Sequence, residues 1–141
     1  MDELPARIDA LLDLRARILA AEMEASTARP PASAAERFDQ RTRTGALRHR
    51  YAHAVRTLRE QIAGDGPEAR HRFATALLLV DEVVQLQHEA ATDDDRPMHA
   101  AMAEQAHAEL RAEVAAMMGA RATAAAPAAL PALRLVRTAT A

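Results

Sequence analysis

The chain has 141 residues, with 18 basic and 20 acidic side chains and a formal net charge of −2, so no strong overall field favours nucleic acid. The absence of cysteine excludes disulfides, thiolate nucleophiles and cysteine-ligated zinc or iron–sulfur clusters. All basic residues are arginine and 37 residues are alanine, which we attribute to the codon usage of a GC-rich bacterial genome. Alanine favours helix and strand formers are few, so we expect an all-α protein with a lean core.

The first half of the chain predicts two helices. Apolar residues at helical spacing from Leu4 to Met23 predict a helix over 3–25, and Pro30 and Pro31 mark the connection after it. Ser33 and Glu36 have the spacing of a capping box, which predicts the start of a second helix that extends to residue 63. Its expected stripe is Leu47, Tyr51, Val55, Leu58 and Ile62, and Gly45 is a weak point of about 1 kcal/mol relative to alanine.

The second half predicts two more helices. The segment 64–67 is a break in which Asp65 is a candidate N-cap, and a third helix over 67–91 carries the strongest apolar pattern, so we expect it to be the most buried. The segment 92–97 supplies further N-cap candidates, and a fourth helix over 96–118 follows, with Gly119 placed to close its end.

Short connections between helices favour antiparallel neighbours, so we expect an up-down-up-down four-helix bundle over residues 1–119. Residues 120–141 are rich in alanine, threonine and proline, which predicts a flexible, disordered C-terminal tail; the alternative is a short peptide that docks on the bundle or on a partner. No apolar run approaches the ~20 residues of a membrane span. The acidic first residues differ from a signal peptide, so we expect a cytoplasmic location.

The second predicted helix is strongly basic. Residues 40–59 contain no acid and hold six arginines and two histidines: Arg41, Arg43, Arg48, Arg50, Arg56 and Arg59, with His49 and His53. This pattern suits the phosphates of nucleic acid or an acidic protein. The alternative is neutralisation within the molecule by Asp81, Glu82, Glu89 and Asp93 to Asp95.

Histidine and glutamate spacing suggests a metal site. His49 and His53 are one turn apart, and Glu104 and His107 have the E-x-x-H spacing of carboxylate-bridged di-iron bundles. If the helices fold back on each other, these residues share a layer with Asp81 or Glu82, and the ligand set would suit iron, manganese or zinc. Di-iron bundles need a second E-x-x-H, which the chain lacks, so the alternative is a set of ordinary surface residues. His88 and His99 bracket the turn before the fourth helix as a second candidate cluster.

Methionines on the fourth helix form a candidate partner surface. Thioether side chains repack easily against varied partners, and the candidates are Met98, Met102, Met117 and Met118, together with Arg48 and Arg56 of the basic helix. The alternative is that these methionines fill the lean core.

Catalytic motifs are absent: the sequence has no nucleophile elbow and no glycine-rich phosphate loop. We therefore expect no enzyme and no cofactor, but a helical protein–protein interaction module, an adaptor or chaperone-like protein that binds another protein or a second copy of itself. In size and helical character the chain is similar to small bacterial export chaperones, a likeness of composition that carries no motif. A metal-binding or oxidative bundle and a nucleic-acid-binding protein are the alternatives.

Overall fold

The structure is a computed structural model that describes residues 3–27 and 33–124. Within these two stretches the chain forms four α helices and no strand: α1 (Glu3–Thr27), α2 (Ala34–Ala63), α3 (Pro67–Thr92) and α4 (Arg96–Ala124). The expectation of an all-α protein with four helices is confirmed for this part of the chain. Most of the expected tail, residues 125–141, lies outside it.

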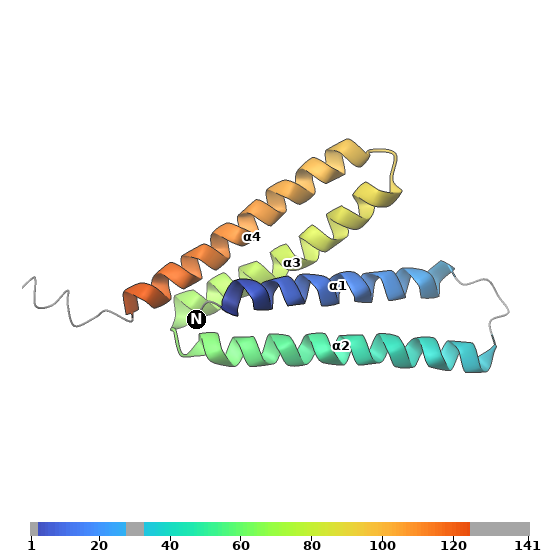
Figure 1. Ribbon diagram of the computed structural model, residues 1–141, viewed down its shortest axis with the longest axis horizontal. Coiled ribbons are helices and arrows are strands. Elements are labelled where there is room, and N and C mark those ends of the chain that lie inside the picture. The colour runs from blue at the N-terminus through green and yellow to red at the C-terminus, as the bar shows by residue number, and fades with distance from the viewer. Residues whose placement is uncertain (1–2, 28–32, 125–141) are drawn as a thin grey trace, which may run out of the picture.

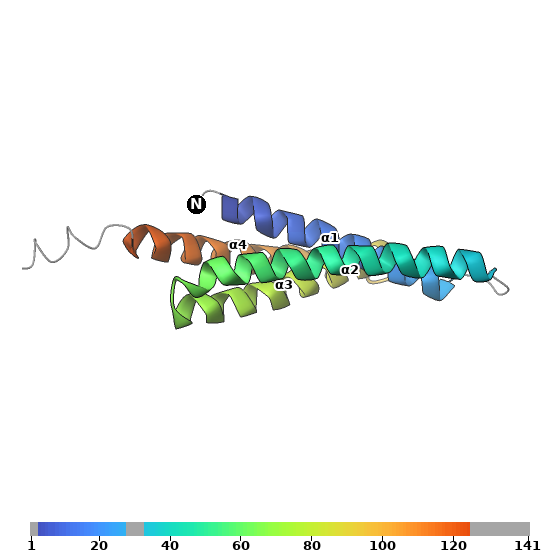
Figure 2. The same cartoon turned by 90° about the horizontal axis from the view of Figure 1, so that it is seen from below.

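The helices are arranged as two hairpins that join at one end and diverge at the other. Figure 1 shows α2 running opposite to α1 and α4 running opposite to α3, with the two helix pairs on separate arms. The most extensive contact is between α3 and α4, while α1 packs on both α2 and α3. Contact between α1 and α4 is slight, and within the described residues the backbones of α2 and α4 do not approach each other closely. In the view of Figure 2, α2 lies in front of α4, and α1 and α3 lie on opposite sides of it.

The main core lies at the joined end, where every helix contributes. Leu4 of α1, Ile62 of α2, Phe73 of α3 and Leu110 of α4 are each at most 2% exposed and belong to one cluster. Buried positions recur at intervals of three or four residues from Leu4 to Ile18 on α1 and from Ala69 to Leu79 on α3, as expected for a helix with one apolar face. Large side chains are few in this sequence, so they close one end of the assembly and leave the arms thinly packed.

Packing along the arms is uneven. A smaller cluster of Val83, Leu86, Ala103 and Ala106 joins α3 to α4, where two alanines let the helices approach closely. The first half of α2 is largely exposed: Thr44 is its single buried residue, and Phe38 is 64% exposed. The helix expected to be most buried, α3, has eight buried residues against three on α2.

One predicted helix end is confirmed and two differ from the sequence prediction. At the confirmed end, the start of α2, the Ser33 hydroxyl accepts a hydrogen bond from the Glu36 amide at 3.1 Å, as the capping motif predicts. Asp65, however, does not cap α3, because Gly66 occupies the N-cap with a φ of 106° that favours glycine, and the Asp65 carboxylate accepts a hydrogen bond from Arg121 instead. Gly119 does not end α4, which continues to Ala124.

The apolar stretches of the four described helices are short and interrupted by charged residues. None of these helices has an apolar stretch long enough for a membrane crossing.

The joined end predicts a sharp contrast between two large apolar residues of α3. Phe73 is 2% exposed and Leu78 is 71% exposed. We expect Phe73→Ala to lower the free energy of unfolding by about 3–5 kcal/mol because it leaves a cavity between all four helices. Leu78→Ala should change it by less than about 0.5 kcal/mol. Urea titrations followed by circular dichroism measure both; equal effects would contradict this core.

Candidate functional site

An apolar groove lies between α1 and α4, the two helices that are side by side with little contact. Its volume is about 300 Å³, and it is lined by Pro5, Ile8, Asp9, Leu12, His107, Leu110, Arg111, Val114, Ala115 and Met118. The α4 wall extends from His107 to Met118, roughly three helical turns. Ile8 and Leu110 form its floor as part of the main core. The groove therefore exposes apolar surface that is continuous with the core.

Opposite charges stand on the two walls of this groove. Asp9 belongs to the α1 wall and Arg111 to the α4 wall, and both are exposed. Neither side chain has a hydrogen bond or ion pair with another described residue, although other arginines of the molecule pair with carboxylates, as Arg15 does with Asp81 at 2.9 Å. An apolar strip with one acid and one base beside it is suited to a complementary amphipathic surface.

This groove was not among the surfaces predicted above, yet the sequence carries a signal for it. On α1, Leu11 is in the core at 1% exposure, while its neighbour Leu12 lines the groove. On α4, Met117 is in the core at 2% exposure, while Met118 lines the groove. Adjacent large apolar residues on a helix are about 100° apart, so each pair widens the apolar face beyond what one neighbouring helix covers.

The predicted methionine surface is divided by the structure. Met117 is buried in the core and Met118 is half-buried in the α1/α4 groove, whereas Met98 and Met102 are 53% and 44% exposed. Core filling therefore accounts for Met117, and the other three remain accessible from solvent. Their role in binding a partner stays a prediction.

A second groove, which we call the arginine groove, lies between the C-terminal half of α1 and the N-terminal half of α2. Its volume is about 710 Å³, and its lining includes Arg37, Arg41 and Arg48, with Glu22 opposite them. Arg48 donates a hydrogen bond to Glu22 at 2.9 Å. Arg41 has no hydrogen bond or ion pair to any described residue. The groove therefore has a net positive charge.

The alternative interpretation, neutralisation of the α2 arginines by acids of α3 and the turn after it, is not found in the described part of the chain. Asp81 pairs with Arg15 of α1, and Glu89 and Asp93 lie beside His99. Glu82 lines a shallow pocket with residues of α4. Arg56, one of the predicted binding residues, is exposed and makes no ion pair with a described residue. The α2 charge is thus available to a ligand, and binding of nucleic acid stays a prediction.

The predicted metal ligands lie on two helices, α2 and α4, whose described backbones do not approach each other closely. His49 and His53 are exposed on α2, and Glu104 and His107 line a shallow pocket beside α3. Because the backbones of α2 and α4 do not approach each other closely in the described structure, the two pairs are not brought together. The described residues contain no group of three or more histidine and acidic side chains placed to hold an ion. The metal-site hypothesis stays a prediction without structural support.

Three helices meet at Tyr51. This side chain is half-buried against the main core, and burial raises its pKa above the ordinary value of 10.0. The carboxylate of Asp81 on α3 adds to the rise, and the guanidinium of Arg15 on α1 opposes it. The register that sequence analysis expected, with positions near 49 level with 81, is therefore close to the observed one.

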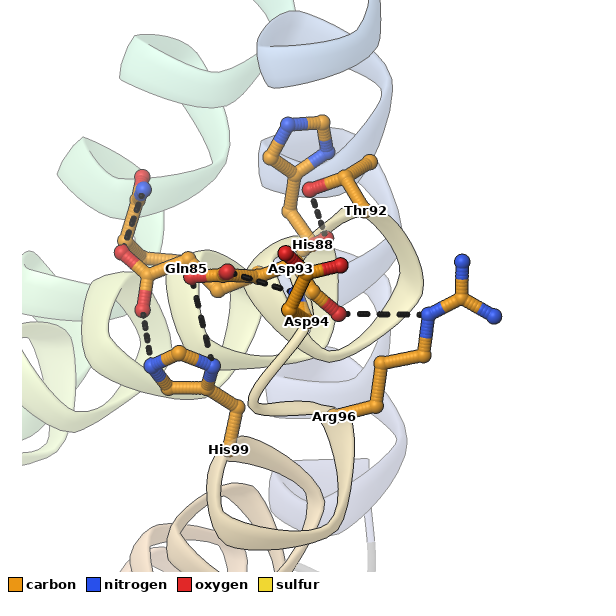
Figure 3. A network of polar contacts seen from close by, with 8 residues as sticks. Gln85, His88, Thr92, Asp93, Asp94, Arg96 and His99 are labelled. Carbon is orange, nitrogen blue, oxygen red and sulfur yellow. Dashed lines mark hydrogen bonds and ion pairs between the residues drawn. The ribbon is translucent and has the colours of Figure 1, made fainter.

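The turn between α3 and α4 is acidic and ordered by local contacts, as Figure 3 shows. The imidazole of His99 is only 13% exposed and lies 3.5 Å from Glu89 and 3.8 Å from Asp93. Asp93 also accepts a hydrogen bond from the Asp94 amide at 2.6 Å, and its carbonyl accepts one from Arg96. The His88 imidazole makes no hydrogen bond or ion pair with a described residue, so the two predicted histidines do not form a hydrogen-bonded pair.

Comparisons with known proteins add no family to these observations. No family model matches the chain, and neither curated proteins nor solved structures include a significant match. Function therefore has to be inferred from the surfaces described above.

The environment of Tyr51 can be tested by its own absorbance, since the chain has a single tyrosine and no tryptophan. We expect the phenol to titrate at higher pH in the native protein than in urea. A raised pKa stabilises the fold below about pH 10 and this contribution is lost as the pH rises through the native pKa. Absorbance of the tyrosinate measures both titrations.

Substitution of Asp81 tests the cause. Asp81→Asn should lower the native pKa because it removes the carboxylate and leaves Arg15 beside the phenol. Glu82→Gln is the control, since Glu82 lies toward α4. Equal midpoints for the native and unfolded protein would show that Tyr51 is not buried at this junction.

Proposed function

We propose that this protein is a non-enzymatic interaction module, an adaptor or chaperone-like protein, that binds an amphipathic helix of another protein in the α1/α4 groove. The observation that carries the proposal is the open apolar strip between two helices that lie side by side with little contact. A helix laid in such a groove buries its apolar face in the manner of many helix-in-groove complexes. The cytoplasmic location expected from the sequence is kept as part of the proposal.

The groove also specifies the chemistry of its partner. Three turns of wall suit a partner helix with large apolar residues at spacings of three and four. Asp9 and Arg111 favour a base on one side of that stripe and an acid on the other. Met118 and Leu12 are both half-buried in the groove. The flexible thioether side chain of Met118 can repack against different partners, which suits a module that accepts related helices.

Two alanines of α4 allow a matched crosslinking experiment. Ala115 lines the groove, while Ala112 lies on the same helix outside it, and both are exposed. A photoreactive benzoylphenylalanine at position 115, introduced in the native host, should give one discrete adduct, identified by mass spectrometry. The same group at position 112 should give none. Adducts at both positions in equal yield, or at neither, would contradict the proposal.

Affinity of the identified partner provides the quantitative test. With both proteins purified, Ala115→Glu should weaken binding at least tenfold, about 1.4 kcal/mol, because it places a charge in an apolar strip. Ala112→Glu should leave the affinity unchanged. Isothermal titration calorimetry should also give a negative heat-capacity change, as burial of apolar surface requires.

A further inference from the structure

We infer that the arginine groove is a binding site for the acidic α3/α4 turn of a second copy of this chain. The arginine groove is a different surface from the α1/α4 groove, so this inference does not rest on the proposed function. The two arms of the molecule carry opposite charges near their tips. No contact inside one described molecule brings these charges together.

The basic partner in this contact is the N-terminal half of α2. Arg41 and Arg48 are seven residues apart, so they lie on the same face of the helix, and both line the groove. Arg48 has one carboxylate contact, with Glu22, and Arg41 has none within the described residues. Gly45 lies between them and a β-carbon there would meet no atom within 4 Å, so the groove is open at this point. The groove therefore offers planar donor groups that suit carboxylates.

The acidic partner is the connection between α3 and α4. The carboxylates of Asp93 and Glu89 lie beside the His99 imidazole. The carboxylates of Asp94 and Asp95, in contrast, have no hydrogen bond or ion pair to any residue in the described ranges. The local hydrogen bonds of Asp93 to the Asp94 amide and to Arg96 hold the backbone of the turn, as Figure 3 shows. Two consecutive free carboxylates on an ordered turn lose little conformational entropy when they bind.

Geometry assigns this turn to another molecule. The arginine groove is near the tip of the α1/α2 hairpin and the acidic turn is the tip of the α3/α4 hairpin, and Figure 1 shows the two tips on diverging arms. Contact within one chain would require the arms to close, whereas a second copy can present its turn directly. Two copies related by a two-fold axis would make the contact twice, and such self-complementary pairing is the commonest form of association.

Charge-reversal substitutions on each of the two surfaces provide the decisive experiment. The basic variant changes Arg41→Glu and Arg48→Glu, and the acidic variant changes Asp94→Arg and Asp95→Arg. Sedimentation velocity at low ionic strength should show self-association of the unmodified chain and at least a tenfold weakening in either variant alone. An equimolar mixture of the two variants should associate again, because both contacts are then complementary: one joins the unchanged groove to the unchanged turn, and the other joins the two reversed surfaces. About 1 M salt, where the Debye length is roughly 3 Å, should dissociate the unmodified protein.

The control uses the opposite face of the same helix. Arg43→Glu with Arg50→Glu makes the same change in net charge on α2 but lies outside the groove, so it should leave self-association unchanged. Circular dichroism spectra and thermal midpoints verify that each variant folds. If Arg48→Glu destabilises the α1/α2 hairpin because it sets a second carboxylate beside Glu22, Arg41→Glu alone replaces the basic variant.

Other results would overturn the inference. They are a monomeric unmodified chain at every concentration, equal weakening by the control, or failure of the mixed variants to associate. A labelled oligonucleotide is titrated in parallel with each variant. If the unmodified chain stays monomeric and binds the oligonucleotide, and only the basic variant loses this binding, the groove is assigned to nucleic acid instead.

Discussion

Burial of Phe73 among residues from all four helices is the interaction on which the rest of the structure depends. Leu4, Ile62 and Leu110 of the other three helices belong to the same buried cluster, and each is almost fully removed from water. Because the sequence contains many alanines and few large apolar side chains, it can build such a core in one place only. Each buried large side chain contributes about 1.5–3 kcal/mol, so the joined end, which holds more of them, contributes more of the stabilisation than the arms.

Divergence of the arms follows from this distribution and creates the surfaces that we relate to function. Close contact of α3 with α4 depends on alanines such as Ala103 and Ala106, while α1 is drawn toward α2 and α3. The groove between α1 and α4 remains open as a result. The arms also keep their charged tips apart, so arginines of α2 and carboxylates of the α3/α4 turn do not neutralise each other. A lean core thus leaves both apolar and charged surface for other molecules.

Sequence reasoning predicted the elements well and their lateral arrangement poorly. Helical periodicity located all four helices, and the fold-back across residues 64–67 gave a register close to that observed between Tyr51 and Asp81. Periodicity does not specify which helices become neighbours, and a layer containing both His49 and His107 assumed that α2 and α4 approach each other. Asp65 was the predicted N-cap of α3, but its carboxylate binds Arg121, a residue 56 positions away, and a local capping pattern does not reveal such a distant partner.

The arrangement of the arms is the central claim, and pulsed electron–electron double resonance tests it directly. The chain has no cysteine, so spin labels can be attached to introduced cysteines alone. Labels at exposed Ala25 and Ala91 report the separation of the two tips, and labels at exposed Ala63 and Ala120 report the joined end. We predict a distinctly longer distance for the tip pair than for the joined-end pair. Equally short distances for both pairs would show a closed bundle and contradict the diverging hairpins.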